Sequence, residues 1–188
     1  MILPIAAYGS SILRKEAENI DSNYPNLQDI IESLFETMHH ANGVGLAAPQ
    51  IGLSICLFVI DSTKMEEDKE KEKKNIIPIK KVFINPEIID FLGESAPFCE
   101  GCLSVPGINE DVIRKSAVKV WYLDEDFVEH EEIFTDIPAR IIQHEYDHLL
   151  GKTFIDKLSP LKKTLLKGKL RDISTGKVET AYKIKSNI

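Results

Sequence analysis

Two histidines and a glutamate give this sequence its clearest chemistry. His144 and His148 lie four residues apart and Glu145 follows the first of them, in the pattern H-E-x-x-H. Positions four apart share one face of a helix, so the two imidazoles can bind one transition-metal ion. Glu145 can then reach a water molecule bound to that ion. The pattern predicts a metal site beside a carboxylate, although two histidines on a surface helix would show the same spacing.

A third protein ligand is needed for an open catalytic site, and the sequence after His148 offers little. No histidine follows, and the next acidic residue is Asp156. Upstream, the run Glu-Gly-Cys-Leu-Ser at 100–104 supplies the thiolate of Cys102. A thiolate with two imidazoles suits a borderline-soft ion such as zinc or iron. Cys102 is therefore the predicted third ligand.

A closed structural zinc site is an alternative, because Cys99 and Cys102 form a C-x-x-C pair. The 41 residues between Cys102 and His144 exceed the roughly 12–15 of a compact zinc finger. A closed site would also leave Glu145 without a function. The open site is the favoured interpretation, and Cys99 and Cys56 are expected to be small packing residues.

Three predicted helices hold or support these residues. The H-E-x-x-H pattern falls on a helix expected over 137–150, with Asp136 as N-cap and Gly151 at its end. A long N-terminal helix is expected over 26–40, because apolar residues recur there on one face. A C-terminal helix is expected from Ser159 to about residue 171.

Short strands should fill most of the interval between the helices. They are expected at 55–60, 81–84, 87–92, 112–123, 127–134 and 178–184. The order lacks regular strand–helix alternation, so it predicts an α+β fold. Mixed or antiparallel strands would pack around the central metal-binding helix, in a single catalytic domain over 1–188.

Composition excludes several functional classes. The 188 residues carry 23 basic and 30 acidic side chains, a net charge of −7, which argues against binding to specific DNA. Residues 64–74 contain five basic and five acidic side chains and predict a solvent-exposed loop. The longest apolar run has six residues, and three cysteines are too few for a disulfide scaffold. We therefore expect a cytoplasmic protein that does not enter the membrane.

Three motifs together resemble the peptide deformylase family. They are Gly-Val-Gly-Leu-Ala-Ala-Pro-Gln at 43–50, Glu-Gly-Cys-Leu-Ser at 100–104 and Gln-His-Glu-Tyr-Asp-His at 143–148. The family's motifs are G-x-G-L-A-A-x-Q, E-G-C-L-S and H-E-x-D-H, and every position matches in the same order. Arg114 also resembles the family's arginine that pairs with the glutamate of the second motif, here Glu100.

The resemblance implies hydrolysis of the N-formyl group from N-formylmethionine at the start of new polypeptides, with release of formate. It implies one divalent ion, Fe²⁺ in vivo, with Zn²⁺, Ni²⁺ or Co²⁺ able to occupy the site in purified protein. Cys102, His144 and His148 would be its ligands. Metal-bound hydroxide would attack while Glu145 acts as general base and acid. Gln50 and the backbone N–H of Leu103 would stabilise the oxyanion.

The substrate is expected to bind as an extended strand. Its backbone would lie near Gly43, Val44 and Gly45 of the first motif and Gly101 of the second. The methionine side chain would enter an apolar pocket lined by Val44 and Ile141. Arg140 departs from the apolar residue of many relatives, and we expect its stem at the pocket mouth and its head in solvent or on the substrate backbone.

Partners follow from the same resemblance. The substrates would be formyl-methionyl nascent peptides, and a basic helix over 157–171, with six basic and no acidic residues, could dock on ribosomal RNA. An ordinary packing helix with a solvated basic face would look the same. The protein is expected to be a monomer. A general H-E-x-x-H metallopeptidase is the alternative enzyme, against which the cysteine ligand and the Gln50 loop argue, and a structural zinc module is the non-catalytic alternative.

Overall fold

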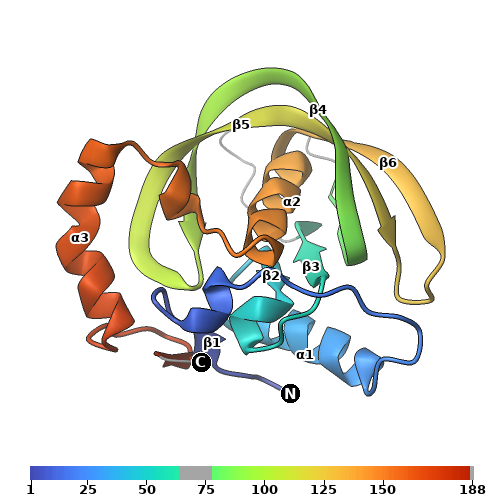
Figure 1. The fold of residues 1–188 in the computed structure, drawn as a ribbon, viewed down its shortest axis with the longest axis horizontal. Helices are drawn as coiled ribbons and strands as arrows, with labels where there is room; N and C mark the ends of the chain where they lie inside the picture. The colour runs from blue at the N-terminus through green and yellow to red at the C-terminus, as the bar shows by residue number, and fades with distance from the viewer. Residues whose placement is uncertain (64–77, 187–188) are drawn as a thin grey trace.

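A five-stranded antiparallel sheet bends around one helix at the middle of the molecule (Figure 1). The structure is a computed structural model that describes residues 1–63 and 78–186, so the predicted charged loop at 64–74 lies outside it. The strands of the sheet are β2 (Gly45–Ala47), β3 (Leu57–Asp61), β4 (Lys80–Cys102), β5 (Val105–Leu123) and β6 (Glu129–Thr135), paired in that order. The predicted α+β class with antiparallel strands is confirmed.

Three helices lie where the sequence predicts helices. They are α1 (Leu27–His40), α2 (Asp136–Leu149) and α3 (Pro160–Ser174), with 3-10 turns η1 (Ser11–Arg14), η2 (Ala48–Ile51) and η4 (Phe154–Lys157). Ser159 caps α3 as expected, since its hydroxyl accepts the Lys162 N–H. The predicted cap of α2 is wrong, because Thr135 is the N-cap and Asp136 is the first helical residue.

The longest strand differs most from the prediction. Two short strands at 81–84 and 87–92 are instead parts of β4, which has 23 residues and continues to Cys102. Asn85 and Pro86 do not end the strand, because the pairing with β5 shifts register between Ile84 and Glu87. A bulge of this kind absorbs a residue that lacks a ladder N–H. The second motif therefore consists of the last three residues of β4 and the two-residue turn into β5.

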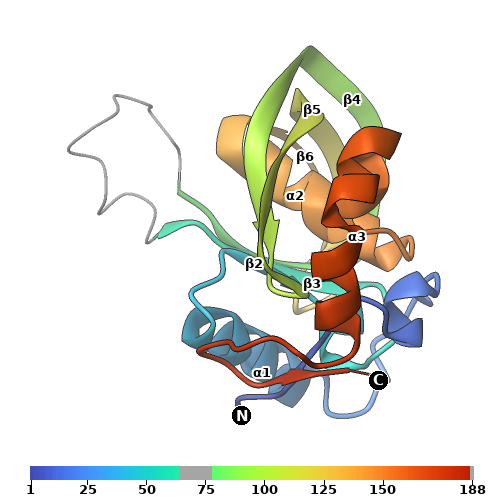
Figure 2. The same ribbon diagram turned by 90° about the vertical axis from the view of Figure 1, so that its left-hand side faces the viewer.

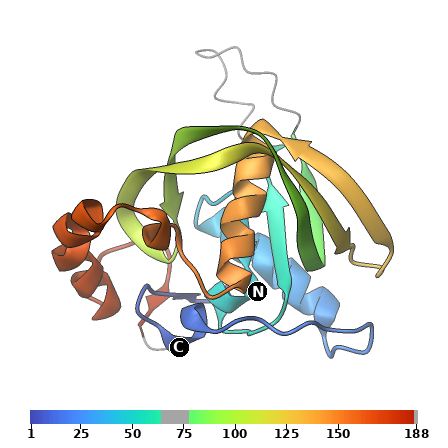
Figure 3. The same cartoon turned by 45° about the horizontal axis from the view of Figure 1, so that its top comes forward.

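Helix α2 is enclosed on nearly all sides. The arch of β4 and β5 covers it on one side and β2 and β3 support it on the other (Figure 3). Twelve of its residues are buried, including His144, Glu145 and His148. An aromatic cluster of Phe58, Phe83, Tyr122 and Phe134 packs between the sheet and this helix. The packing of the strands around α2 therefore holds these polar side chains in the interior of the protein.

The first and last described strands of the chain pair with each other. β7 (Ile184–Lys185) pairs in parallel with β1 (Ile5–Ala6), so the segment after α3 returns to the N-terminus at the base of the molecule (Figure 2). The predicted strand at 178–184 is thus much shorter and lies at the end of that range. Among the described residues, no helix is both long and apolar enough to cross a membrane.

Candidate functional site

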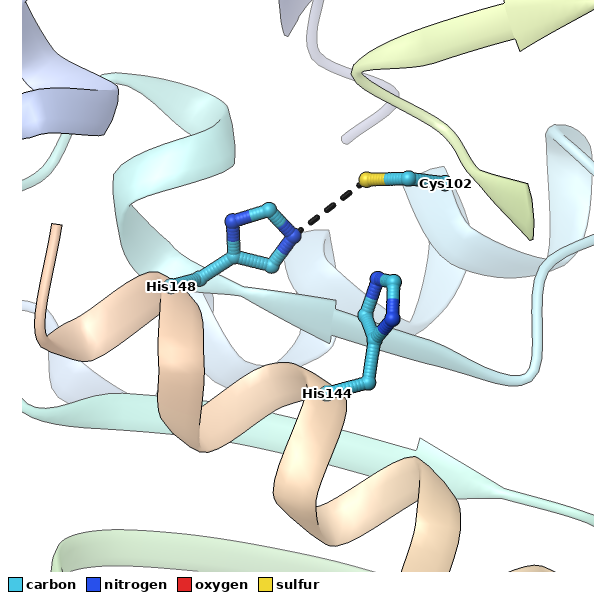
Figure 4. A group of neighbouring side chains, drawn as sticks. All are labelled: Cys102, His144 and His148. Atoms are coloured by element: carbon cyan, nitrogen blue, oxygen red, sulfur yellow. Dashed lines mark hydrogen bonds between the residues drawn. The ribbon is translucent and has the colours of Figure 1, made fainter. Parts of the chain in front are cut away.

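Cys102, His144 and His148 converge at the end of β4 and on the buried face of α2 (Figure 4). One ligand atom from each lies within 4.8 Å of the other two, and the Cys102 Sγ to His148 Nε2 distance is 3.3 Å. Burial lowers the pKa of His148, which favours the neutral ring that a metal requires. A sulfur and two ring nitrogens in this arrangement fit a divalent ion of the zinc or iron type.

Cys99 does not belong to this group. Its side chain is exposed, and the metal-competent cluster contains only the three residues above among those described. The closed four-ligand site is therefore not formed. The expectation that Cys99 packs in the interior is also wrong, whereas Cys56 is half-buried with its thiol on the Ala17 carbonyl.

Glu145 is buried beside the three ligands with one carboxylate oxygen, Oε2, that has no hydrogen-bond partner. Burial raises its pKa to about 7. Gly45 makes room for it, since a Cβ at position 45 would lie 2.5 Å from Glu145 Oε1. The first motif and the H-E-x-x-H helix thus touch through a glycine that no larger residue can replace without displacing the carboxylate.

A buried ion-pair network holds the ligand His144. Glu100 accepts the His144 Nδ1–H at 3.0 Å and receives Arg114 through Nε at 2.6 Å and Nη2 at 3.0 Å. Burial alone would raise the pKa of Glu100, but these bonds outweigh it and lower the pKa. Asp147 accepts Arg114 Nη1 at 2.7 Å, so both carboxylates share one guanidinium. The predicted Glu100–Arg114 pair is present, and the structure adds Asp147 to it.

The predicted oxyanion donors lie on the cysteine side of the site. Gln50 is almost fully buried, and its Oε1 accepts the Ala47 N–H at 2.8 Å. Its Nε2 donates to Ser104 Oγ at 3.2 Å and lies 3.7 Å from Cys102 Sγ. Leu103 follows Cys102 in the turn between β4 and β5. The amide of Gln50 is therefore fixed at both ends and directed toward the ligand cluster.

Cys102, His144 and Glu145 line a cavity of about 540 Å³. The predicted substrate-binding residues all line it: Gly43, Val44, Gly45, Gly101, Arg140 and Ile141. Three C-terminal residues that the sequence analysis did not single out also line it: Glu179, Thr180 and Tyr182. They fall within the predicted strand at 178–184, but no motif marks them, and the chain is irregular there up to residue 183.

The Arg140 head does not reach solvent, which is one of the two positions expected for it. Its side chain is buried, Nη2 donates to the Ala96 carbonyl at 3.0 Å, and the guanidinium lies 5.2 Å from the centre of the Phe98 ring. The expectation that its head reaches solvent is wrong, because β4 passes over α2 and supplies both contacts. Nη1 remains buried without a partner, so one donor of this guanidinium is free.

Comparisons with known proteins match nearly the whole chain. The family model described as "Polypeptide deformylase" matches residues 2–164. A peptide deformylase of Christiangramia forsetii is 49% identical over 188 residues, with 98% of this chain and 96% of that protein covered. One of Flavobacterium johnsoniae is 48% identical with the same coverage. A crystal structure of a peptide deformylase from Legionella pneumophila is 39% identical with a TM-score of 0.80, covering 94% of this chain and 98% of that one.

Proposed function

The chain belongs to the polypeptide deformylase family, a metal-dependent hydrolase that removes the formyl group from N-formylmethionine, and we propose how its residues divide this reaction. Water adds to the formyl carbon, the C–N bond breaks, and formate and a free amine leave. The observation that carries the proposal is the convergence of Cys102, His144 and His148 beside the buried carboxylate of Glu145.

Cys102, His144 and His148 would hold the metal ion. We expect Fe²⁺ in vivo, with Zn²⁺, Ni²⁺ or Co²⁺ able to replace it in purified protein. When bound, the ion supplies a Lewis acid that polarises the reacting groups. The Glu100–Arg114 pair orients His144 through its Nδ1–H, in the way that outer carboxylates orient metal-binding histidines.

Glu145 moves the proton. Its carboxylate accepts a proton from the attacking water and delivers it to the amine nitrogen as the C–N bond breaks, because an amine leaves poorly as an anion. The unpartnered Oε2 supports this role, since no existing hydrogen bond must break first. Gln50 Nε2–H and the Leu103 N–H donate to the formyl oxygen as it gains negative charge. The Leu103 donor is a backbone N–H and the Gln50 side chain is almost fully buried, so neither donor has to move far to reach the formyl oxygen.

The substrate would lie along the first motif. Gly43, Val44 and Gly45 would pair with an extended peptide backbone and Gly101 would border it, while Val44 and Ile141 contact the methionine side chain. The free Nη1 of Arg140 would donate to a backbone carbonyl of the substrate. Arg140→Leu should therefore raise KM for formyl peptides, and an unchanged KM would exclude this role.

One assay tests the whole assignment. Purified under anaerobic conditions, the protein should release formate from formyl-Met-Ala-Ser in proportion to its bound metal, and it should leave casein intact. Cleavage of casein would favour a general metallopeptidase instead. Metal content and rate measured on the same samples would also identify the active ion.

For the cellular setting, we propose a cytoplasmic monomer with one catalytic domain over 1–188 that acts on nascent peptides near the ribosome. Helix α3 exposes Leu161 and Leu165 and buries Leu170. Lys162 pairs with Glu110, whereas Lys167 and Lys169 form no ion pair within the described part of the chain. The ammonium groups of Lys167 and Lys169 are therefore the ones suited to bind phosphate groups of ribosomal RNA.

Sedimentation with ribosomes tests this docking. The protein should co-sediment at low salt and dissociate as salt rises. Lys167→Gln with Lys169→Gln should weaken the association, and Lys80→Gln on the sheet should not. No association, or association unaffected by the double variant, would leave α3 as a packing helix.

A further inference from the structure

The turn that follows the ligand cysteine is held by a residue from the C-terminal tail. The Tyr182 hydroxyl donates to the Leu103 carbonyl oxygen at 2.8 Å, across 79 positions of sequence. The next carbonyl in the turn, that of Ser104, accepts the Tyr8 N–H at 2.7 Å. Both carbonyls of this two-residue turn are therefore fixed from outside the β4–β5 hairpin that contains it.

The tail that carries Tyr182 is itself fixed. β7 pairs with β1, and the Ile5 N–H donates to the Lys183 carbonyl at 2.9 Å, directly after Tyr182. The Tyr182 ring packs on the same core cluster as the Leu103 side chain. Burial raises the pKa of Tyr182 to about 12, so its hydroxyl remains a donor at neutral pH. The tyrosine is thus a rigid clamp on Leu103.

We propose that Tyr182 is a positioning residue for the oxyanion donor at Leu103. Residues 179–185 would then contribute to the deformylase site by holding this tyrosine in place. This inference rests on the role proposed above for the Leu103 N–H. In a two-residue turn closed by the Cys102–Val105 pair, the direction of one peptide group constrains the next. Holding the Leu103 carbonyl therefore holds the adjacent N–H toward the formyl oxygen.

A clamp predicts a specific kinetic signature. Without the Tyr182 hydroxyl, the Leu103 carbonyl would bond to water and the turn could rotate, which weakens a contact that matters most in the transition state. The rate should fall while substrate binding and metal binding stay nearly unchanged. A tail with only a structural role would instead lower the melting temperature and leave kcat per bound metal unaltered.

Tyr182→Phe is the decisive variant, because it removes the hydroxyl and keeps the ring. Tyr24→Phe is the matched control, since Tyr24 packs on the same core cluster far from the cavity. With formyl-Met-Ala-Ser, kcat of Tyr182→Phe should fall about tenfold, less than the roughly 10²–10³-fold loss of a whole oxyanion donor. KM, metal content and Tm should match those of Tyr24→Phe.

Hydrogen exchange gives a readout independent of turnover. In the zinc-loaded protein, Tyr182→Phe should speed exchange at the amides of Leu103 and Ser104, and Tyr24→Phe should not. A kcat within twofold of wild type, or unchanged exchange at this turn, would overturn the inference. If Gln50→Ala lowers kcat and Tyr182→Phe does not, only the clamp fails. If neither lowers kcat, the proposed oxyanion site fails with it.

Discussion

Arg114 is the residue whose loss should damage this protein most without touching substrate or metal. Its side chain is 2% exposed and holds Glu100 and Asp147 at once, through three bonds of 2.6–3.0 Å. Arg114→Met keeps the length of the stem and removes the charge. Glu100, which is 7% exposed, would then be left in the interior without a cation, and Asp147, which is 10% exposed, would keep only Lys157 at 3.2 Å.

The expected magnitude follows from that burial. Removing one partner of a buried ion pair typically costs about 3–5 kcal/mol, because the remaining charge is not solvated. At roughly 2–4 °C per kcal/mol for a protein of this size, Tm should fall by about 6–20 °C. Since Glu100 also orients His144, metal affinity should weaken by about 10–100-fold, as for other outer partners of metal-binding histidines.

Thermal unfolding of the zinc-loaded protein and a zinc titration against a competing chelator measure the two effects. Lys119→Met is the matched control. It removes a cation from the same strand, but the Lys119–Glu131 pair is on the surface, with side chains 36% and 50% exposed. Such a pair contributes about 0–1 kcal/mol. A Tm difference of about 2–3 °C corresponds to only about 1 kcal/mol. If the Tm of Arg114→Met lies that close to the Tm of the control, and the variant binds zinc equally well, the argument from burial is refuted.

Three further outcomes follow from the site and its supports. Glu145→Gln should lower kcat by about 10²–10⁴-fold with unchanged metal content, because the amide cannot move a proton, and elemental analysis beside kinetics checks this. Removal of the metal with a chelator should abolish activity and lower Tm, and zinc or anaerobic Fe²⁺ should restore both. Asp156→Ala should cost about 0.5–2 kcal/mol at pH 7, since Asp156 accepts the Thr153 N–H that begins η4. Burial alone would raise the pKa of Asp156, but its bonds to Thr153 and Arg14 hold this pKa below 3.8. The stability that Asp156 contributes is therefore present above pH 3.8 and is lost as the pH falls through the folded pKa. Denaturant unfolding of the wild type and the variant should give the same stability below that pH.

Local periodicity explains what could be predicted about the site. His144 and His148 were predictable as a pair because helical spacing converts sequence distance directly into spatial distance. Cys102 followed from the lack of other suitable ligands after His148. Gly45 could be placed near the site by its motif, but only the structure shows that it leaves room for the Glu145 carboxylate.

Tertiary pairing explains what could not be predicted. Tyr182 falls inside the predicted strand at 178–184, but the chain is irregular up to residue 183 and no motif marks this tyrosine. Its contact with Leu103 exists because β7 pairs with β1, a pairing of two residues on each side. A strand of two residues shows no alternation of its own, so the sequence indicated a longer strand here and did not place these side chains in the cavity wall.

The error at Arg140 and the error in β4 have one cause. Pro86 favours a break between the predicted strands at 81–84 and 87–92, because proline lacks the N–H of a ladder bond. The bulge at Ile84 and Glu87 lets β4 continue, and the strand then passes over α2 and brings the Ala96 carbonyl to the Arg140 guanidinium. With β4 ended at residue 92, this acceptor would be missing, and an arginine four positions before His144 would be expected to turn to solvent. The continuous strand therefore covers the metal-binding helix and also occupies Nη2 of Arg140. Nη1 is then the one nitrogen of this side chain that is buried without a partner, and it is the donor that remains for the substrate.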